Sequence, residues 1–190
     1  MLDAVWNIYF YKTKILSYKH LKTNFVQVLQ NLNVKNRPWK FSTCKSTYHS
    51  DAEIPWSLLL AELYIPFEKF FAELEPINDI TWSISDLWAN IYETGDYQEI
   101  HDHTHSISGF SFIFMLQKSE EDLLVFESPL DSLINLSSLS CFKKYDSTPY
   151  RPVLEEGEVL IFPNWIKHYV LPNTGNITRM SITGNININT

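Results

Sequence analysis

The stretch GEVLIFPNWIKH, residues 157–168, places a turn, a strand and a histidine in immediate succession. Gly157 follows two glutamates, an arrangement typical of a tight turn between strands. The apolar run VLIF then suits a buried strand, and Pro163 ends it because proline cannot donate a hydrogen bond to a neighbouring strand. The pattern predicts that His168 lies at the mouth of this strand.

Short runs of the same kind recur from about Asp79 to the C-terminus, rich in Ile, Tyr, Phe, Trp and Val and separated by turn signals. They predict seven or eight strands. The runs are ITWSISDLWANIYE, in which Asp86 is a candidate break, YQEIHDH, GFSFIFML, DLLVFES, the region around RPVL, EVLIFP, HYVLP and TRMSITGNI.

The part of the chain before these strands shows helical periodicity. After an N-terminal run, MLDAVWNIYFYKTKIL, that is typical of an edge strand, apolar residues three and four apart predict a helix from Ser17, its candidate N-cap, to about Asn33. A second helix is predicted from about Pro55 to Leu74, and Pro66 should kink or divide it. Both helices are expected to pack on the sheet and to carry no chemistry.

Helices followed by antiparallel strands indicate the α+β class, with a jelly roll backed by N-terminal helices. A chain of 190 residues and 22.3 kDa suits one hydrophobic core, so a single domain is expected. Within it, residues 1–78 supply the N-terminal strand and supporting helices, and residues 79–190 supply the β core.

Composition excludes several classes of function. The 15 basic and 22 acidic residues give a formal net charge of −7, so nucleic-acid binding is unlikely. No stretch approaches the roughly 18 consecutive apolar residues of a membrane span. The two cysteines, Cys44 and Cys141, lack CxxC spacing, and the expected location is therefore the cytoplasm.

Four of the six histidines fall in two strand-like segments. His101, His103 and His105 alternate in IHDHTHS, and alternate side chains of a strand project from one face, so a His-x-His pair can hold one metal ion. His168 is the expected third ligand, since a small jelly roll brings distant strands together. The competing interpretation is that these imidazoles are solvated or satisfy ordinary buried hydrogen bonds.

Arg179 follows His168 by eleven residues, in TRMSITGN. If the intervening loop LPNTGNIT reverses the chain, Arg179 enters the sheet on the next strand, beside His168. An arginine inside a barrel requires an anion, and a carboxylate bound through two hydrogen bonds is its best partner. The alternative is a surface arginine paired with an acidic residue.

The order of these motifs resembles that of the 2-oxoglutarate and Fe(II)-dependent dioxygenases, particularly a subgroup common in marine bacteria and their phages. The matching motifs cover about 100 residues of the C-terminal half of the chain. They are Trp88-Ala-Asn90, Gly95-Asp-Tyr97, His101-Asp-His103, Ser108-Gly109-Phe110, Gly157 through His168, and Arg179-Met-Ser181-Ile182.

The resemblance implies a double-stranded β-helix, cupin-like, around an Fe(II) ion held by His101, His103 and His168. It implies that Arg179 pairs with the distal carboxylate of 2-oxoglutarate and that Tyr92 and Asn90 lie at the co-substrate. The implied reaction couples oxidative decarboxylation of 2-oxoglutarate by molecular oxygen to hydroxylation of a substrate C–H bond. The implied location extends to the cytoplasm of an infected host cell.

The chain departs from the family pattern at one ligand. Most members have His-x-Asp, whereas this chain has His103 in place of the carboxylate, and Asp102 should point to the opposite face of the strand. Three imidazoles suit zinc as well as iron. The register also permits His103 and His105 as the pair in place of His101 and His103.

Two rival functions follow from these departures. One is a cupin-like three-histidine metalloprotein that does not use 2-oxoglutarate, and the other is a structural jelly roll without enzymatic activity. Phe110, Phe112, Phe162 and Trp165 suggest an aromatic lining that would exclude water from the site, and ordinary core packing explains them equally well. No motif indicates the prime substrate or the oligomeric state.

Overall fold

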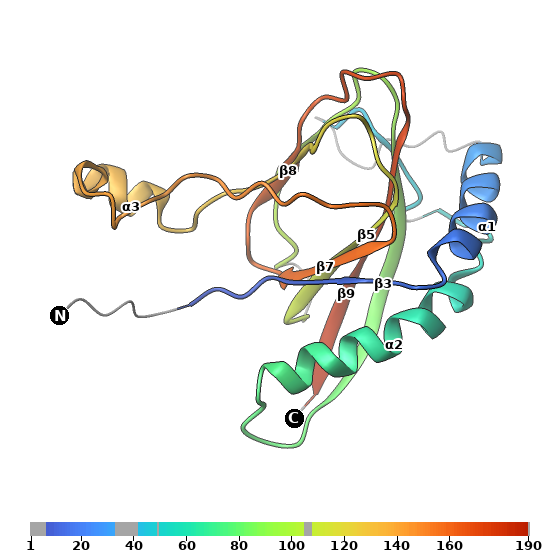
Figure 1. Ribbon diagram of the computed structural model, residues 1–190, viewed down its shortest axis with the longest axis horizontal. Coiled ribbons are helices and arrows are strands. Elements are labelled where there is room, and N and C mark those ends of the chain that lie inside the picture. The colour runs from blue at the N-terminus through green and yellow to red at the C-terminus, as the bar shows by residue number, and fades with distance from the viewer. Residues whose placement is uncertain (1–6, 33–41, 49, 105–107, 190) are drawn as a thin grey trace.

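The structure is a computed structural model that describes residues 7–32, 42–48, 50–104 and 108–189. Its strands form two antiparallel sheets (Figure 1). The strands are β1 (Tyr11–Lys14), β2 (Lys45–Ser46), β3 (Thr81–Tyr92), β4 (Gln98–His101), β5 (Phe110–Gln117), β6 (Leu124–Phe126), β7 (Glu158–Pro163), β8 (His168–Val170) and β9 (Arg179–Asn189). The larger sheet has the order β1-β7-β5-β9-β3-β2, and the smaller has the order β4-β8-β6.

The helices are α1 (Tyr18–Asn31), α2 (Trp56–Glu73), the short α3 (Asp131–Leu136) and the 3-10 turn η1 (Leu139–Cys141). The two long helices lie where the periodicity predicts them, and β1 is an edge strand as predicted. Pro66 lies inside α2 without dividing it. Ser17 occupies the N-cap position of α1, but its side chain makes no capping hydrogen bond, which differs from the expectation.

The larger sheet has a hydrophobic cluster on each face. On one face, side chains of β5 and β9 such as Phe112 and Ile182 pack against α1 and α2. On the other face, Ile113 and Phe162 pack toward Leu124 of the smaller sheet. The molecule therefore has three layers, helices, larger sheet and smaller sheet, and the space between the two sheets is where interior polar residues gather.

A β-bulge in β3 changes which side chains face that interior. The register with β9 shifts between Ile84 and Asp86, so the predicted break at Asp86 is a bulge within one long strand. Ile84 belongs to the helix-facing cluster, whereas Trp88 lines the space between the sheets. Gly184 permits the bulge, because a Cβ there would lie 2.7 Å from the carbonyl oxygen of Asp86.

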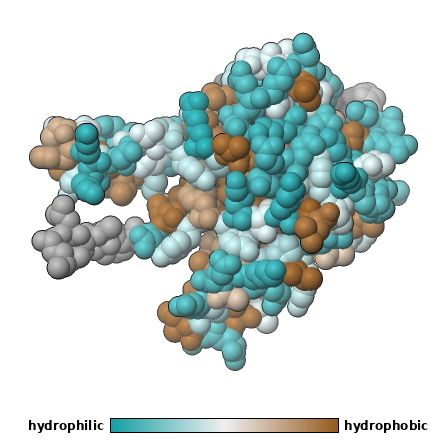
Figure 2. All heavy atoms as spheres, viewed as in Figure 1, coloured by the Kyte–Doolittle hydropathy of each residue, from teal (hydrophilic) through white to brown (hydrophobic). Residues whose placement is uncertain are grey.

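One sequence expectation for the strands is wrong. The region around RPVL forms no strand, and only Tyr150 makes an isolated bridge, to Phe126. The segment with α3 and η1 projects from the two-sheet body (Figure 1). On the face shown in Figure 2, apolar residues lie in small groups among polar ones. Among the described residues, no helix combines the length and apolar character needed to cross a membrane.

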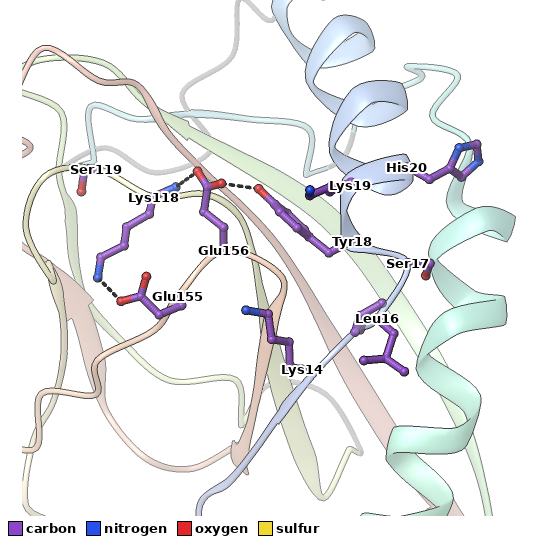
Figure 3. Close-up of a pocket in the computed structure, with 11 residues that line it drawn as sticks. Lys14, Leu16, Ser17, Tyr18, Lys19, His20, Lys118, Ser119, Glu155 and Glu156 are labelled. Atoms are coloured by element: carbon purple, nitrogen blue, oxygen red, sulfur yellow. Dashed lines mark hydrogen bonds and ion pairs between the residues drawn. The ribbon is translucent and has the colours of Figure 1, made fainter.

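The turn at Gly157 docks the start of α1 on the larger sheet. Gly157 has φ +85°, and a Cβ at this position would lie 2.6 Å from the ring of Tyr18. Figure 3 shows the groove beside this contact, in which the Tyr18 hydroxyl donates to the carboxylate of Glu156. Lys22 also donates to Glu156, at 2.8 Å. The groove is formed by residues quite separate from those of the interior polar space.

The Glu156 contacts predict a pH dependence of stability. Burial raises the pKa of the Glu156 carboxyl, but the hydrogen bonds from Lys22 and Tyr18 outweigh burial and hold the pKa below its usual range. A carboxyl with a depressed folded-state pKa stabilises the fold above its unfolded pKa of about 4.3, and this contribution is lost as the pH falls through the folded-state pKa.

We therefore expect Glu156→Gln to lower the urea midpoint at pH 7 and to have progressively less effect as the pH falls below about 4. Urea unfolding followed by circular dichroism at several pH values measures this difference. Glu73→Gln, an exposed change of the same type, is the matched control. An equal effect of Glu156→Gln at pH 7 and at pH 3 would contradict the assignment.

Candidate active site

Three histidines converge between the two sheets. His101 ends β4 and His168 begins β8, and the two residues are paired in register. His103 lies two residues further on, where its backbone N–H donates to the carbonyl of Asn164 at 2.8 Å. The ring centroids of His101 and His168 are 4.3 Å apart, and those of His103 and His168 are 5.0 Å apart. One ring nitrogen from each histidine lies within 4.8 Å of the others, a spacing that can hold a metal ion.

Each of these imidazoles is held through its Nδ1 atom. Nδ1 of His101 lies 2.8 Å from the carbonyl oxygen of Glu99, and Nδ1 of His168 lies 3.0 Å from that of Ile166. A carbonyl only accepts, so Nδ1 carries the proton in both residues. Nε2 of each ring is then available as a metal ligand, the arrangement that outer hydrogen bonds impose at metal sites.

Electrostatics keep His168 in the neutral form that binds metal. Burial lowers the pKa of His168 well below its usual value, and His101 and His103 lower it further. A neutral imidazole offers a lone pair to a cation, whereas a protonated one does not.

Asp102, between the two histidines of the HDH motif, is directed elsewhere. Its carboxylate accepts hydrogen bonds from the Thr104 hydroxyl at 2.6 Å and the Thr104 backbone N–H at 3.1 Å. These bonds hold the pKa of Asp102 below its usual value. Asp102 is not among the described residues that cluster as metal ligands, in agreement with the alternation argument. His105, the alternative ligand, lies outside the described residues.

Arg179 is the first residue of β9 and is only 2% exposed. Its guanidinium lies 4.8 Å from the ring centroid of Tyr92 and donates to the hydroxyl of Ser181 at 3.4 Å. Within the described ranges, no carboxylate lies within 4.0 Å of this guanidinium. Burial lowers the pKa of Arg179 because the charged form loses its solvation. A buried cation in this state has a strong preference for an anion.

The three predicted co-substrate residues share one face of two paired strands. Tyr92 is paired with Arg179, Asn90 with Ser181 and Trp88 with Thr183, so these side chains extend in rows from the arginine toward the histidines. One cavity contains all of them. Its lining is Trp88, Asn90, Tyr92, Gln98, His101, His103, Ile113, Leu124, His168, Val170, Arg179, Ser181 and Thr183.

Among the residues that the structure describes, two buried polar atoms in this cavity lack a hydrogen-bond partner. They are the side-chain oxygen of Asn90 and the indole nitrogen of Trp88, and both residues are only 3% exposed. Buried polar atoms normally have hydrogen-bond partners, so this acceptor and this donor, beside an arginine with no carboxylate partner in the described part of the chain, are suited to a polar ligand. The neutral imidazoles and the buried guanidinium together fit a divalent metal and a dicarboxylate.

The structure corrects the expected position of Arg179 relative to His168. The loop after β8 does reverse the chain, but it crosses from the smaller sheet to the larger one, so the strands of the two residues are not neighbours. Arg179 and His168 instead line the same cavity from strands of the two different sheets. Tertiary packing of the two sheets, and not strand pairing, brings them together.

The expected aromatic lining is mostly wrong. Phe162 packs on His168 with a centroid distance of 5.1 Å, as expected. Phe110 and Phe112 belong to the helix-facing cluster, because they fall on the opposite parity of β5 from Ser111, which contacts His103. Trp165 is 46% exposed, because it lies in the turn after β7.

Gln98 and Trp88 line the cavity and were not predicted as site residues. Gln98 accepts a hydrogen bond from the Tyr92 hydroxyl at 2.6 Å, and its amide nitrogen lies 3.5 Å from Nε2 of His101. The register of β4 is irregular between Gln98 and His101, so strand alternation alone does not predict that these two side chains are close. Trp88 is two positions before Asn90, so strand alternation would have identified it.

A sequence profile of the family described as "Putative 2OG-Fe(II) oxygenase" matches residues 86–185, more than half of the chain. The chain therefore belongs to the 2-oxoglutarate and Fe(II)-dependent oxygenases. As members of this family are 2-oxoglutarate-dependent iron enzymes, Fe(II) is its metal and 2-oxoglutarate and oxygen are its co-substrates. No curated protein matches the sequence.

Solved structures show the same fold at low sequence identity. A prolyl-4-hydroxylase of Pseudomonas putida is 12% identical, with a TM-score of 0.61, 94% of this chain covered and 91% of that chain. HygX of Streptomyces hygroscopicus, solved with nickel and 2-oxoglutarate bound, is 10% identical, with a TM-score of 0.63 and coverages of 95% and 83%.

An oxidoreductase of the 2OG-Fe(II) oxygenase family from Burkholderia pseudomallei is 15% identical, with a TM-score of 0.52. The match covers 69% of this chain and 57% of the Burkholderia protein. The likeness to these structures confirms the predicted double-stranded β-helix, the jelly roll of this family.

Proposed function

We propose that His101, His103 and His168 hold the Fe(II) ion and that Arg179 binds the distal carboxylate of 2-oxoglutarate. The observation that carries this proposal is a buried guanidinium, without a carboxylate partner among the described residues, in the same cavity as three convergent imidazoles. Burial of the guanidinium charge is energetically unfavourable unless an anion binds to it. A carboxylate matches the geometry of the guanidinium.

The remaining cavity residues have supporting roles in this proposal. Tyr92 supports the guanidinium, which lies 4.8 Å from its ring centroid, and the Ser181 hydroxyl accepts a hydrogen bond from the guanidinium. The open side-chain oxygen of Asn90 and the indole N–H of Trp88 lie between the arginine and the histidines, where they contact the co-substrate or the prime substrate. Phe162 and Phe126 shield His168 from water.

The reaction proposed is hydroxylation of a substrate C–H bond. When bound, the Fe(II) ion would supply the chemistry that activates oxygen. The residues of the protein orient the co-substrate and exclude water from the cavity. The three-imidazole set also suits zinc, which would favour the cupin-like alternative without 2-oxoglutarate. The burial of Arg179 in the cavity favours the oxygenase.

Anaerobic titration tests the proposal directly. Addition of Fe(II) and then 2-oxoglutarate should produce a visible metal-to-ligand charge-transfer band that neither component produces alone. Subsequent admission of oxygen should convert 2-oxoglutarate to succinate. Tight metal binding without any band on adding 2-oxoglutarate would support the cupin-like alternative, and failure to bind Fe(II), Mn(II) or Ni(II) would support a structural role.

A further inference from the structure

A hydrogen-bonded chain leads from His103 to a carboxylate outside the cavity. Nδ1 of His103 lies 2.7 Å from the hydroxyl oxygen of Ser111 and 3.0 Å from the side-chain oxygen of Asn185. The Ser111 hydroxyl donates to the same Asn185 oxygen at 2.8 Å. The amide nitrogen of Asn185 donates to the carboxylate of Asp86 at 3.1 Å. Ser111 and Asn185 are fully buried.

Asp86 determines which way the Asn185 amide points. A carboxylate only accepts hydrogen bonds, so the NH₂ group of Asn185 must face it and the oxygen must face His103. If Nδ1 were unprotonated, its lone pair would point at the lone pairs of the Asn185 oxygen, and the two atoms, 3.0 Å apart, would repel each other. His103 therefore carries its proton on Nδ1, and the ring lone pair that can bind a metal ion is on Nε2.

The hydrogen bonds from His103 through Asn185 to Asp86 also bring a carboxylate close to a ligand set that has none of its own. Three neutral imidazoles bring no negative charge to the metal, whereas most members of the family are expected to supply one carboxylate. Asp86 places a carboxylate two hydrogen bonds behind His103, and the β-bulge at Asp86 turns its side chain to the cavity face of β3. Outer hydrogen-bonded partners of this kind orient a ligand and raise its basicity.

We propose that Asp86 and Asn185 are positioning residues that select the metal-binding form of His103 and supply, from the outer shell, the negative charge that the ligand set lacks. This inference rests on the proposed function for the identity of His103 as a ligand. It assigns a role to two residues that the sequence motifs do not single out, and it predicts an effect on the metal-free protein as well as on metal affinity.

The first test is nitrogen-15 NMR of the metal-free protein, in which the shifts of the two ring nitrogens distinguish the protonated from the unprotonated one. His103 of the wild type should be protonated on Nδ1. In Asp86→Asn, the new amide no longer fixes the orientation of Asn185, and a mixture of the two ring forms is expected. A wild-type His103 protonated on Nε2 would overturn the proposal.

The second test is a swap of the two side chains. Asp86→Asn alone should weaken Co(II) binding about 10-fold, the lower end of the effect of outer-shell changes. Asn185→Asp alone places two carboxylates face to face and should lower the melting temperature. The double variant Asp86→Asn/Asn185→Asp restores a donor facing an acceptor, with the new carboxylate against Nδ1 of His103, and should recover both properties.

Asp79→Asn, an exposed change of the same charge, is the matched control and should leave Co(II) binding unchanged. The positioning role would be refuted if Asp86→Asn kept a Co(II) affinity within about threefold of the wild type. It would also be refuted if the double variant recovered neither the Co(II) affinity nor the melting temperature lost in the single variants. Because neither readout uses 2-oxoglutarate, the absence of a charge-transfer band would count against the proposed function alone.

Discussion

Arg179→Met is expected to weaken 2-oxoglutarate binding roughly 100-fold while leaving metal binding intact. Loss of one partner of a buried charged pair costs about 3 kcal/mol or more, which corresponds to roughly 100-fold weaker binding. Calorimetric titration of the Mn(II)-loaded protein with 2-oxoglutarate, without oxygen, measures this loss. Arg179→Lys should be intermediate, because an ammonium keeps the charge but cannot bind both carboxylate oxygens in parallel.

The same substitution should not destabilise the metal-free protein. Arg179 is a buried cation without a carboxylate partner in the described part of the chain, and apolar replacements of buried charges of similar volume are often neutral or stabilising by about 1–4 kcal/mol. Arg151→Met, at an exposed position, is the matched control. Normal 2-oxoglutarate affinity in Arg179→Met would remove the basis of the proposed function.

His168→Ala is expected to remove the metal site. The loss of one of three ligands should reduce Fe(II) and Mn(II) affinity by more than the roughly 10- to 100-fold typical of outer-shell changes. Equilibrium binding of Mn(II) followed by electron paramagnetic resonance provides the measurement, and the charge-transfer band should disappear in parallel. The metal-free protein should remain folded, because His168 is neutral and no ion pair is lost.

Two control variants separate this effect from general disruption. His20→Ala changes an exposed histidine of α1 and should leave metal binding unchanged. Asp102→Ala removes the carboxylate between His101 and His103, which is hydrogen-bonded to Thr104 and directed away from the histidine cluster. Loss of Mn(II) binding in Asp102→Ala, with retention in His103→Ala, would show that the conventional His-x-Asp ligands operate here.

Local pattern was sufficient for much of the fold. The β-branched and aromatic runs of β3, β5 and β9 and the helical periodicity of α1 and α2 depend on residues that are close in sequence, and the sequence predicts these elements near their observed positions. The region around RPVL was misread as a strand because a short apolar run does not reveal whether a partner strand lies beside it. The aromatic lining failed for a related reason, since the parity of Phe110 and Phe112 relative to the cavity depends on which face the helices cover.

The alternation of His101 and His103, the strand mouth at His168 and the arginine at Arg179 were evident from the amino-acid sequence, because residue type and a period of two are local properties of a strand. Only the tertiary structure decided that Arg179 lines the cavity of the histidines from the larger sheet, and that Gln98 and Trp88 line the same cavity. The contact of Asp86 with Asn185, 99 residues away, likewise depends on a bulge and a strand pairing. Such contacts depend on how whole sheets pack and twist. A local pattern of residues does not determine the distance between side chains that are far apart in the sequence.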